Sequence, residues 1–361
     1  MRDDAANVTL RFTTTAKELL AALDSARSAT PTAPTLTAYA GVRLEVADHV
    51  LTVTGADGEI QIEALVRLDP SLAHQNGSVL VAPGPLATLL RSLPAASRVS
   101  VSFGTDLAIS AEGLHTYNLR TIHATLPPPP KSAVAETAVS LVGLQLAVAA
   151  VKPASGREMA GAQLVTDGTT LSLRTTDSYR LHACAITAAD LPAFQGVLPI
   201  AALSRIADIN PTHLSLDAHS RVVVARSSTV RITARMLGLP FPNVERLLAQ
   251  TPPHTLAVSS SSLLESLSRL QAVAENSPVA FSVKDGIATI SASNVEVGAG
   301  VEELEVSGED MEFSLARQFL TDAVNAVRSE TVLISFTSPS QAVLVSAPGS
   351  TTRCVVMPVR Q

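Results

Sequence analysis

The sequence predicts an α+β chain made of three copies of one domain, and three observations support this prediction. The 361 residues are too many for one ordinary core and suit two or three domains. Alternating, strand-like stretches and two amphipathic helices occur in one order, which then recurs twice at intervals of roughly 115 to 126 residues. The composition, 46% hydrophobic and 16% charged, is typical of packed cores and argues against intrinsic disorder.

The first helix of each copy opens its repeat. We expect these helices over residues 16–29, 142–153 and 262–275. Leucines at helical spacing give the first and third helices an apolar stripe. Both also begin with the capping-box pattern, in which two side chains satisfy free backbone amides at the helix start: Thr15 with Glu18, and Ser262 with Glu265.

Strand pairs and second helices follow in the same order. The strand pairs are expected over residues 42–54, 163–175 and 279–291, with polar turns at Asp48-His49, Asp167-Gly168 and Asp285-Gly286. The second helices are expected near residues 83–94, 199–209 and 315–328, which gives six helices in all. Each of them precedes a further alternating hairpin, over residues 99–119, 214–234 and 332–356.

Two proline-rich stretches separate the copies, one at Pro127 to Lys131 and one at Thr251 to Pro253. We therefore expect three domains, at residues 1–131, 132–253 and 254–361. Their similar size and short linkers favour a curved, closed assembly. An array of independent domains is the alternative.

Composition also limits the class of function. No apolar run approaches the roughly 18 residues that cross a bilayer, and residues 1–15 lack a signal-peptide core, so a cytoplasmic protein without membrane contact is expected. A net charge of −6 argues against a strongly basic nucleic-acid coat, although it allows a locally basic channel. With no Trp and 3% aromatic residues, stacking of single-stranded bases is poorly supported. Cys184 and Cys354 lack partner motifs and are expected to be packing residues.

An enzyme is the main rival class. The eight histidines are scattered, without metal-ligand spacing, and the sequence has no nucleophile elbow or phosphate-binding glycine loop. His182 lies near Asp177, but on an alternating strand the two side chains would point to opposite faces, so no acid–base pair is expected. We therefore expect no catalytic residue, no metal and no cofactor.

Three short motifs carry a resemblance to a known family: Thr176 to Leu181 (TDSYRL), Phe241 to Leu247 (FPNVERL) and Val355 to Gln361 (VVMPVRQ). In this order, on a threefold repeat, the chain resembles the DNA polymerase III beta subunit, the bacterial sliding clamp family, along essentially its whole length. The resemblance implies a head-to-tail homodimeric ring around duplex DNA, with helices lining the hole and antiparallel sheets outside. Such a ring is a nucleoid-associated processivity factor without a catalytic site. Its partners are the DNA polymerase III alpha subunit, the clamp loader and other proteins with clamp-binding motifs.

The motif positions also imply a pocket for partner peptides. Its physical basis is an apolar trough of Leu, Val, Met and Pro side chains that accepts Leu and Phe anchors, with arginines at the margin. The implied residues are Thr176, Tyr179, Arg180, Leu181, Pro242, Arg246, Leu247, Val355, Met357, Pro358, Val359 and Arg360.

Basic side chains lie in or beside the predicted helices of all three copies. A single one of them is equally well explained as part of a solvated helix face, but their recurrence favours a shared basic lining that faces DNA. They are Lys17, Arg27, Arg91, Lys152, Arg157, Arg205, Arg269, Arg317 and Arg328. The dimer interface is expected where Tyr117 and Leu119 of one copy meet Ala272 and Val273 of the other.

The chain departs from the usual motifs at a few positions. Ser178 and Tyr179 stand where many members of the family have Gly-His or Arg-Phe, and Gln361 stands where Leu is common. These changes leave open a specialised second clamp, such as a resistance or backup paralogue. A three-repeat scaffold that does not bind DNA is the other alternative.

Overall fold

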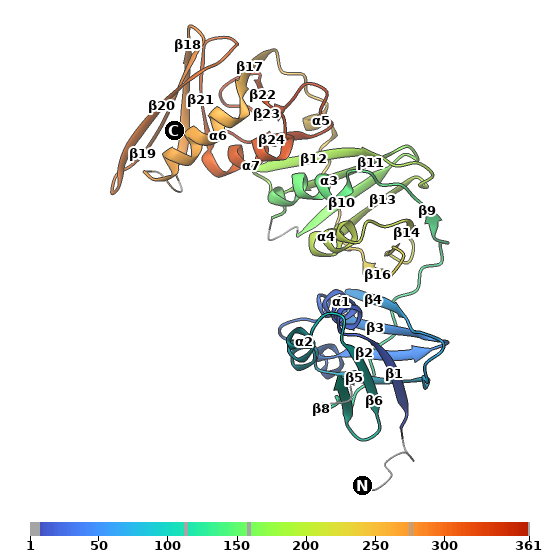
Figure 1. The fold of residues 1–361 in the computed structure, drawn as a ribbon. Helices are drawn as coiled ribbons and strands as arrows, with labels where there is room; N and C mark the ends of the chain where they lie inside the picture. Colours follow the sequence, from blue (N-terminus) through green and yellow to red (C-terminus); the bar gives the residue numbers. More distant parts are fainter. Residues whose placement is uncertain (1–7, 112–114, 157–159, 274, 276, 360–361) are drawn as a thin grey trace. The chain divides into compact units, whose positions relative to one another are not determined.

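The computed structural model describes residues 8–111, 115–156, 160–273, 275 and 277–359 (Figure 1). The chain is α+β, and its sheets are built from antiparallel strand pairs. It divides into two compact units, Met1–Ala138 with Pro211–Met236 (unit 1), and Val139–Asn210 with Leu237–Gln361 (unit 2).

Unit 1 contains two sheets. The first has the order β1 (Leu10–Thr15), β6 (Arg98–Phe103), β7 (Leu107–Ala111), β8 (His115–Leu119). The second has the order β5 (Gly77–Val81), β2 (Val42–Ala47), β3 (Val50–Ala56), β4 (Ile60–Arg67), β16 (Val230–Arg235), β15 (Val222–Arg226), β14 (His213–Asp217), β9 (Thr137–Ala138). The register of β4 with β16 joins strands of the first and second predicted copies in one sheet.

The helices of unit 1 are α1 (Ala16–Arg27), the short 3-10 helix η2 (Thr37–Ala40) and α2 (Pro83–Ser92). The predicted capping box at the start of α1 is confirmed, since Thr15 accepts from the backbone N–H of Glu18 and the Glu18 carboxylate accepts from that of Thr15. Leu19 and Leu23 of α1 are fully buried in a core shared with both sheets. The apolar stripe thus fixes which side of α1 faces solvent.

Unit 2 repeats this plan. One sheet has the order β13 (Phe194–Pro199), β10 (Gly161–Thr166), β11 (Thr170–Thr176), β12 (Arg180–Thr187), β24 (Arg353–Val356), β23 (Val343–Ser346), β22 (Thr331–Phe336), β17 (His254–Ser259). The other has the order β20 (Gly298–Glu305), β19 (Ile287–Asn294), β18 (Pro278–Lys284), β21 (Met311–Ala316). Strands of the second and third predicted copies are joined where β12 pairs with β24.

The helices of unit 2 are α3 (Leu144–Val151), η3 (Lys152–Ala154), α4 (Ile200–Asp208), α5 (Glu245–Leu248), α6 (Ser260–Gln271) and α7 (Arg317–Val327). The predicted capping box of Ser262 with Glu265 is wrong, because α6 begins earlier and its cap is Ser259, which accepts from the N–H of Ser262. Four consecutive serines offer equivalent caps to a reader of the sequence. The end of β17 at Ser259 decides among them.

The predicted turns and hairpins differ in detail from the structure. Asp48, His49 and Asp285 have positive φ angles of 48°, 60° and 48°, as two-residue hairpin turns require. The turn between β10 and β11 has three residues rather than two, because β10 ends at Thr166 and β11 begins at Thr170. Each predicted hairpin after a second helix is a three-stranded meander.

Candidate functional site

Two of the three sequence motifs meet across a pair of strands in unit 2. Strand β12 pairs with β24 so that Leu181 lies opposite Val355 and Arg180 opposite Val356. Beyond β24, the Met357 N–H donates to the carbonyl oxygen of Tyr179 at 2.9 Å. Segments about 175 residues apart in sequence are therefore held side by side by backbone hydrogen bonds.

The remaining motif, Phe241 to Leu247, completes an apolar cluster with the other two. Leu181, Val244, Leu344 and Val355 are each at most 5% exposed and pack together, and Phe241, Leu247, Leu248 and Ala342 pack around them. The sequence predicts Leu181, Leu247 and Val355 here. It misses Leu344, whose place depends on the pairing of β23 with β24, and Val244, which lies inside the second motif.

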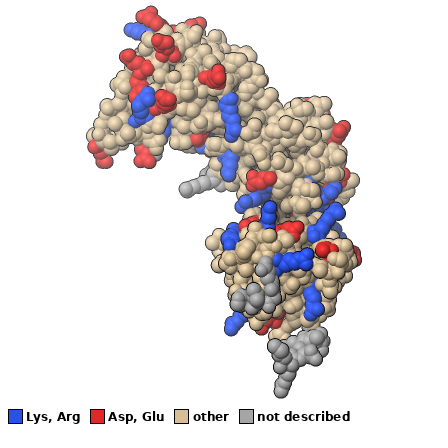
Figure 2. Space-filling view, in the orientation of Figure 1, with Lys and Arg blue, Asp and Glu red and all other residues tan. Residues whose placement is uncertain are grey.

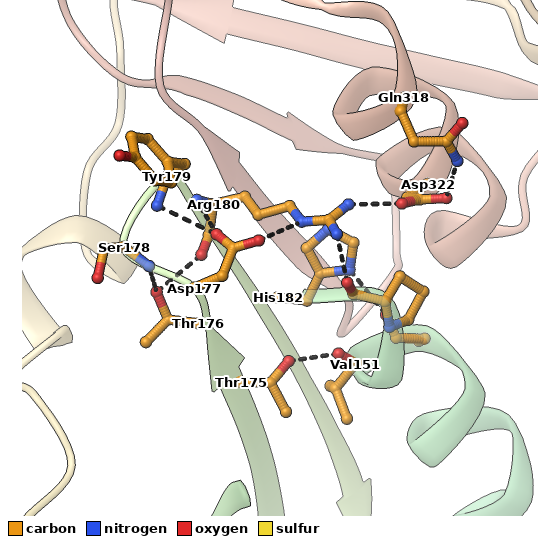
Figure 3. Close-up of polar contacts among 12 residues, drawn as sticks. Val151, Thr175, Thr176, Asp177, Ser178, Tyr179, Arg180, His182, Gln318 and Asp322 are labelled. Atoms are coloured by element: carbon orange, nitrogen blue, oxygen red, sulfur yellow. Dashed lines mark hydrogen bonds and ion pairs between the residues drawn. The ribbon is translucent and has the colours of Figure 1, made fainter. Parts of the chain in front are cut away.

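The first motif forms a tight turn between β11 and β12 (Figure 3). The Asp177 carboxylate accepts the backbone N–H groups of Tyr179 and Arg180 at 3.1 and 2.9 Å, and the Thr176 hydroxyl donates to the carbonyl of Arg180 at 2.7 Å. Ser178 adopts a φ of 75°, a left-handed conformation that ordinarily favours glycine. The turn leaves Tyr179 67% exposed, beside the apolar cluster.

Arg180, which is expected at the margin of the peptide pocket, also has a structural role in this turn. Its guanidinium is bound by Asp177 at 2.9 Å, by Asp322 of α7 and by the carbonyl oxygen of Pro153 in η3 (Figure 3). Its carbon Cζ lies 4.3 Å from the ring centroid of Phe319. The side chain is only 11% exposed. Arg180 therefore ties the turn to η3 and α7, and three of its five N–H donors are engaged within the protein.

The C-terminal tail supplies exposed apolar side chains next to the cluster. Met357 is 42% exposed and Val359 37%, while Pro358 is half-buried in a bridge to Leu315 of β21. The tail also borders a cavity of about 850 Å³ over β18, β19 and β21. Of the other expected pocket residues, Pro242 and Arg246 are exposed and Thr176 is buried. Arg360 lies outside the described residues.

His182 and Asp177 do not form an acid–base pair. Asp177 lies in the turn and binds Arg180, whereas the Nδ1 of the buried His182 lies 2.8 Å from the carbonyl oxygen of Ala150. Burial lowers the pKa of His182 below its ordinary value of 6.5, so the ring is neutral. Within the described ranges, no cluster of three or more His, Cys, Asp or Glu residues could hold a metal ion, and no helix is long and apolar enough to cross a membrane.

Comparison with known proteins identifies the family. Residues 10–126 match the model of the DNA polymerase III beta subunit N-terminal domain, and residues 245–360 match that of its C-terminal domain. The beta sliding clamps of Salmonella typhimurium and Escherichia coli K12 are 26% and 25% identical to the chain, over 97% of its length and 100% of theirs. The chain belongs to the bacterial sliding clamp family.

Solved sliding clamps share the fold of this clamp chain. A crystal structure of the Pseudomonas aeruginosa DNA polymerase sliding clamp with a ligand has a TM-score of 0.89 at 22% identity, covering 98% of this chain and 100% of that one. A second Pseudomonas aeruginosa clamp structure, bound to griselimycin, has a TM-score of 0.88 at 22% identity and the same coverage.

The basic residues expected to line the channel of a clamp have three different environments. Arg317 is buried, 5% exposed, and donates to the carbonyl oxygen of Glu275 at 3.1 Å, so it does not belong to any basic surface. Three arginines are exposed but bound by carboxylates: Arg27, Arg91 and Arg269. Four side chains are exposed and make no ion pair with any described residue: Lys17, Lys152, Arg205 and Arg328. Arg157 lies outside the described residues.

The residues expected at the dimer interface of the clamp lie at two open sheet edges. Tyr117 is 42% exposed on the edge strand β8 of unit 1, and Leu119 on the same strand is half-buried against the core. In unit 2, β20 is an edge strand of the four-stranded sheet. Val273 packs against it at Gly300, where an added Cβ would lie 2.9 Å from a methyl carbon of Val273. Ala272 is exposed beside it.

Proposed function

We propose that this chain is a DNA polymerase processivity factor, which closes as a head-to-tail homodimer around duplex DNA and tethers partners through a peptide-binding surface. Family membership supports the processivity role, and the observation that carries the tethering is the convergence of the three motifs on one apolar cluster. We propose no catalytic step, because the candidate surface consists of apolar side chains and structural ion pairs.

Ring closure has a physical rationale in the two open edges. An exposed edge strand presents unpaired backbone N–H and C=O groups, which proteins usually cover. Strand β8 of one copy can pair with β20 of the other, and a twofold arrangement then covers all four edges. Apolar side chains at both edges, Tyr117 on β8 and the 64% exposed Val301 on β20, support the pairing. Acidic side chains gather over β18–β21 (Figure 2), which disfavours pairing of β20 with itself.

Binding to DNA would be topological. Lys17, Lys152, Arg205 and Arg328 would contact phosphates without reading bases, so binding is weak, salt-dependent and independent of sequence. The closed path then prevents escape while the ring slides. The three-domain division, at residues 1–131, 132–253 and 254–361, would place six such domains around the hole.

The peptide surface would accept a short linear segment with Leu and Phe anchors. Leu181, Leu247 and Val355 supply the apolar floor, and the exposed Pro242 and Met357 supply the rim. Such a small site binds modestly, at roughly 1 μM or about −8 kcal/mol, which suits partners that exchange. We propose the polymerase III alpha subunit and the clamp loader as partners.

A single experiment tests the processivity proposal. The protein is loaded by a clamp loader onto nicked circular DNA, and its retention is measured before and after the circle is linearised. We expect stable retention on the circle and rapid loss from the linear form. Equal retention on both forms would contradict a ring and favour a three-repeat scaffold.

A specialised second clamp is the alternative that one observation favours. Tyr179 stands exposed at the edge of the peptide surface, on a turn that Ser178 holds in a left-handed conformation. The bulk of Ser178 and Tyr179 should discriminate among ligands more than the glycine of relatives would, and bulky cyclic peptides should bind poorly. Titration of a linear and a cyclic ligand against wild type and Tyr179→Gly tests this alternative, since a specialised clamp should regain the cyclic ligand in the variant.

A further inference from the structure

We propose that Asp24 limits the grip of the channel on DNA by binding two of its arginines. This inference rests on the proposed function, because it takes the exposed sides of α1 and α2 as facing DNA. It assigns a role to a carboxylate where the sequence pattern pointed only to cations.

One oxygen atom of Asp24 binds both arginines. The Arg27 Nε lies 2.6 Å from Asp24 Oδ1, and the Arg91 Nη2 lies 2.8 Å from the same atom. Asp24 and Arg27 are on α1, and Arg91 is on α2, so the carboxylate links two helices that pack together. All three side chains are 40 to 47% exposed, and solvent and ions therefore reach the group.

The first helix of the third copy also pairs a candidate channel cation with acids, but with the roles reversed, since one arginine is bound by two carboxylates. Arg269 on α6 is bound by Glu302 of β20 at 2.6 Å, and Glu265 one turn earlier lies 3.7 Å away. The hydrogen bond from Arg269 lowers the pKa of Glu302, so this carboxylate stays charged at neutral pH. Three of the seven exposed candidate cations in the described chain are thus paired with an acid.

The pairing weakens phosphate binding in two ways. A phosphate must compete with Asp24 for the guanidinium groups. Once a phosphate is bound, the negative charge of Asp24 remains nearby and repels it. Exposed ion pairs are weak, so a phosphate can still displace Asp24 from the arginines. The pairing therefore lowers their affinity for phosphate without abolishing it. The site presents one net positive charge where its two arginines alone would present two.

Asp24→Asn tests the inference because it keeps the shape of the side chain and removes its charge. We expect slower release from nicked circular DNA and a steeper dependence of retention on salt. The slope of log K against log salt should steepen by about 0.9 for each arginine that engages a phosphate. A threefold change in salt concentration should then separate variant and wild type by about threefold per contact.

Two further variants show whether the effect belongs to this group. Asp106→Asn makes the same charge change at an exposed site in the turn between β6 and β7, and should leave the slope unchanged. Adding Arg91→Gln to Asp24→Asn should remove much of the gain, because one freed arginine is then absent.

The outcomes separate this inference from the proposed function. If wild type is retained on circles and lost from linear DNA but Asp24→Asn leaves the salt slope unchanged, only the role of Asp24 is overturned. The same gain in Asp106→Asn also overturns it, because net charge then explains the effect. Wild type without topology-dependent retention overturns both proposals.

Discussion

Replacing Arg180 by methionine should destabilise the fold, even though the motif resemblance places this residue at a ligand-binding margin. Methionine keeps much of the length of the side chain and removes the guanidinium. The change leaves the Asp177 and Asp322 carboxylates and the carbonyl oxygen of Pro153 without their donor.

The magnitude follows from the burial of the three charged side chains. Arg180 is 11% exposed, and its partners Asp177 and Asp322 are 17% and 19% exposed. Removing one partner of a buried ion pair costs about 3 to 5 kcal/mol. Because the two carboxylates retain some contact with water, we expect the low end, about 3 kcal/mol, or roughly a hundredfold change in the ratio of folded to unfolded protein.

The assay combines urea unfolding with titration of a fluorescent peptide of the Gln-x-x-Leu-x-Phe type. Arg180→Met should lower the urea midpoint. Peptide affinity should fall only through an indirect effect, the loss of order in the turn that carries Tyr179. Arg180→Lys should lie between wild type and Arg180→Met, because an ammonium group can bind one carboxylate but cannot reproduce the planar fork.

Arg246 provides the matched control, because it is the other described arginine of the expected margin. Its side chain is exposed and makes no ion pair or hydrogen bond with the described residues. Arg246→Met should leave the urea midpoint unchanged and lower affinity for a peptide that carries a carboxylate. The reasoning is refuted if Arg180→Met abolishes peptide binding at an unchanged urea midpoint.

Three further predictions concern the tail, pH and the dimer. Deleting residues 357–361 removes the backbone hydrogen bonds that Met357 and Val359 donate, worth about 1 kcal/mol each, so light scattering should show a dimer while the titration shows no peptide binding. Burial lowers the pKa of His182 below its ordinary value of 6.5. The free energy of unfolding should therefore be highest above pH 6.5 and decrease below it, because His182 takes up a proton in the unfolded chain first. The slope is at most about 1.4 kcal/mol per pH unit in urea unfolding, and His182→Asn should flatten it. Tyr117→Glu or Val273→Asp should give monomers by light scattering, and a dimer that survives both changes would exclude the proposed edge pairing.

The sequence predicts the elements whose signals are local. Positive φ angles at Asp48 and Asp285 follow from short polar turns, and the leucine spacing of α1 is enough to specify its buried face. The apolar cluster is partly predictable for a different reason. Leu181 and Val355 each lie in a motif whose neighbours are also distinctive, and the resemblance brings these motifs together.

Features that depend on distant partners escape sequence analysis. Arg180 and Asp322 are 142 residues apart, and nothing near either residue indicates their ion pair. Leu344 joins the apolar cluster only because β23 and β24 pair in one register. The sheets that cross the predicted domain boundaries, through β4 with β16 and β12 with β24, likewise depend on pairing that period-2 alternation cannot specify.

The candidate channel arginines show that the number of basic residues in a sequence overstates the number that can bind phosphate. The partner of Arg27 is three residues away at Asp24, a helical spacing that is visible in the sequence, whereas the main partner of Arg269, Glu302, lies on a distant strand. Arg317 is buried where α7 begins, which no charge pattern indicates. A count of cations is therefore an upper limit on phosphate contacts. Such pairing would weaken a protein that binds DNA by affinity alone. The proposed ring would depend less on these contacts, because enclosure rather than contact would prevent escape. Paired arginines in the proposed channel are thus compatible with processivity, and they would favour a ring that moves easily along DNA.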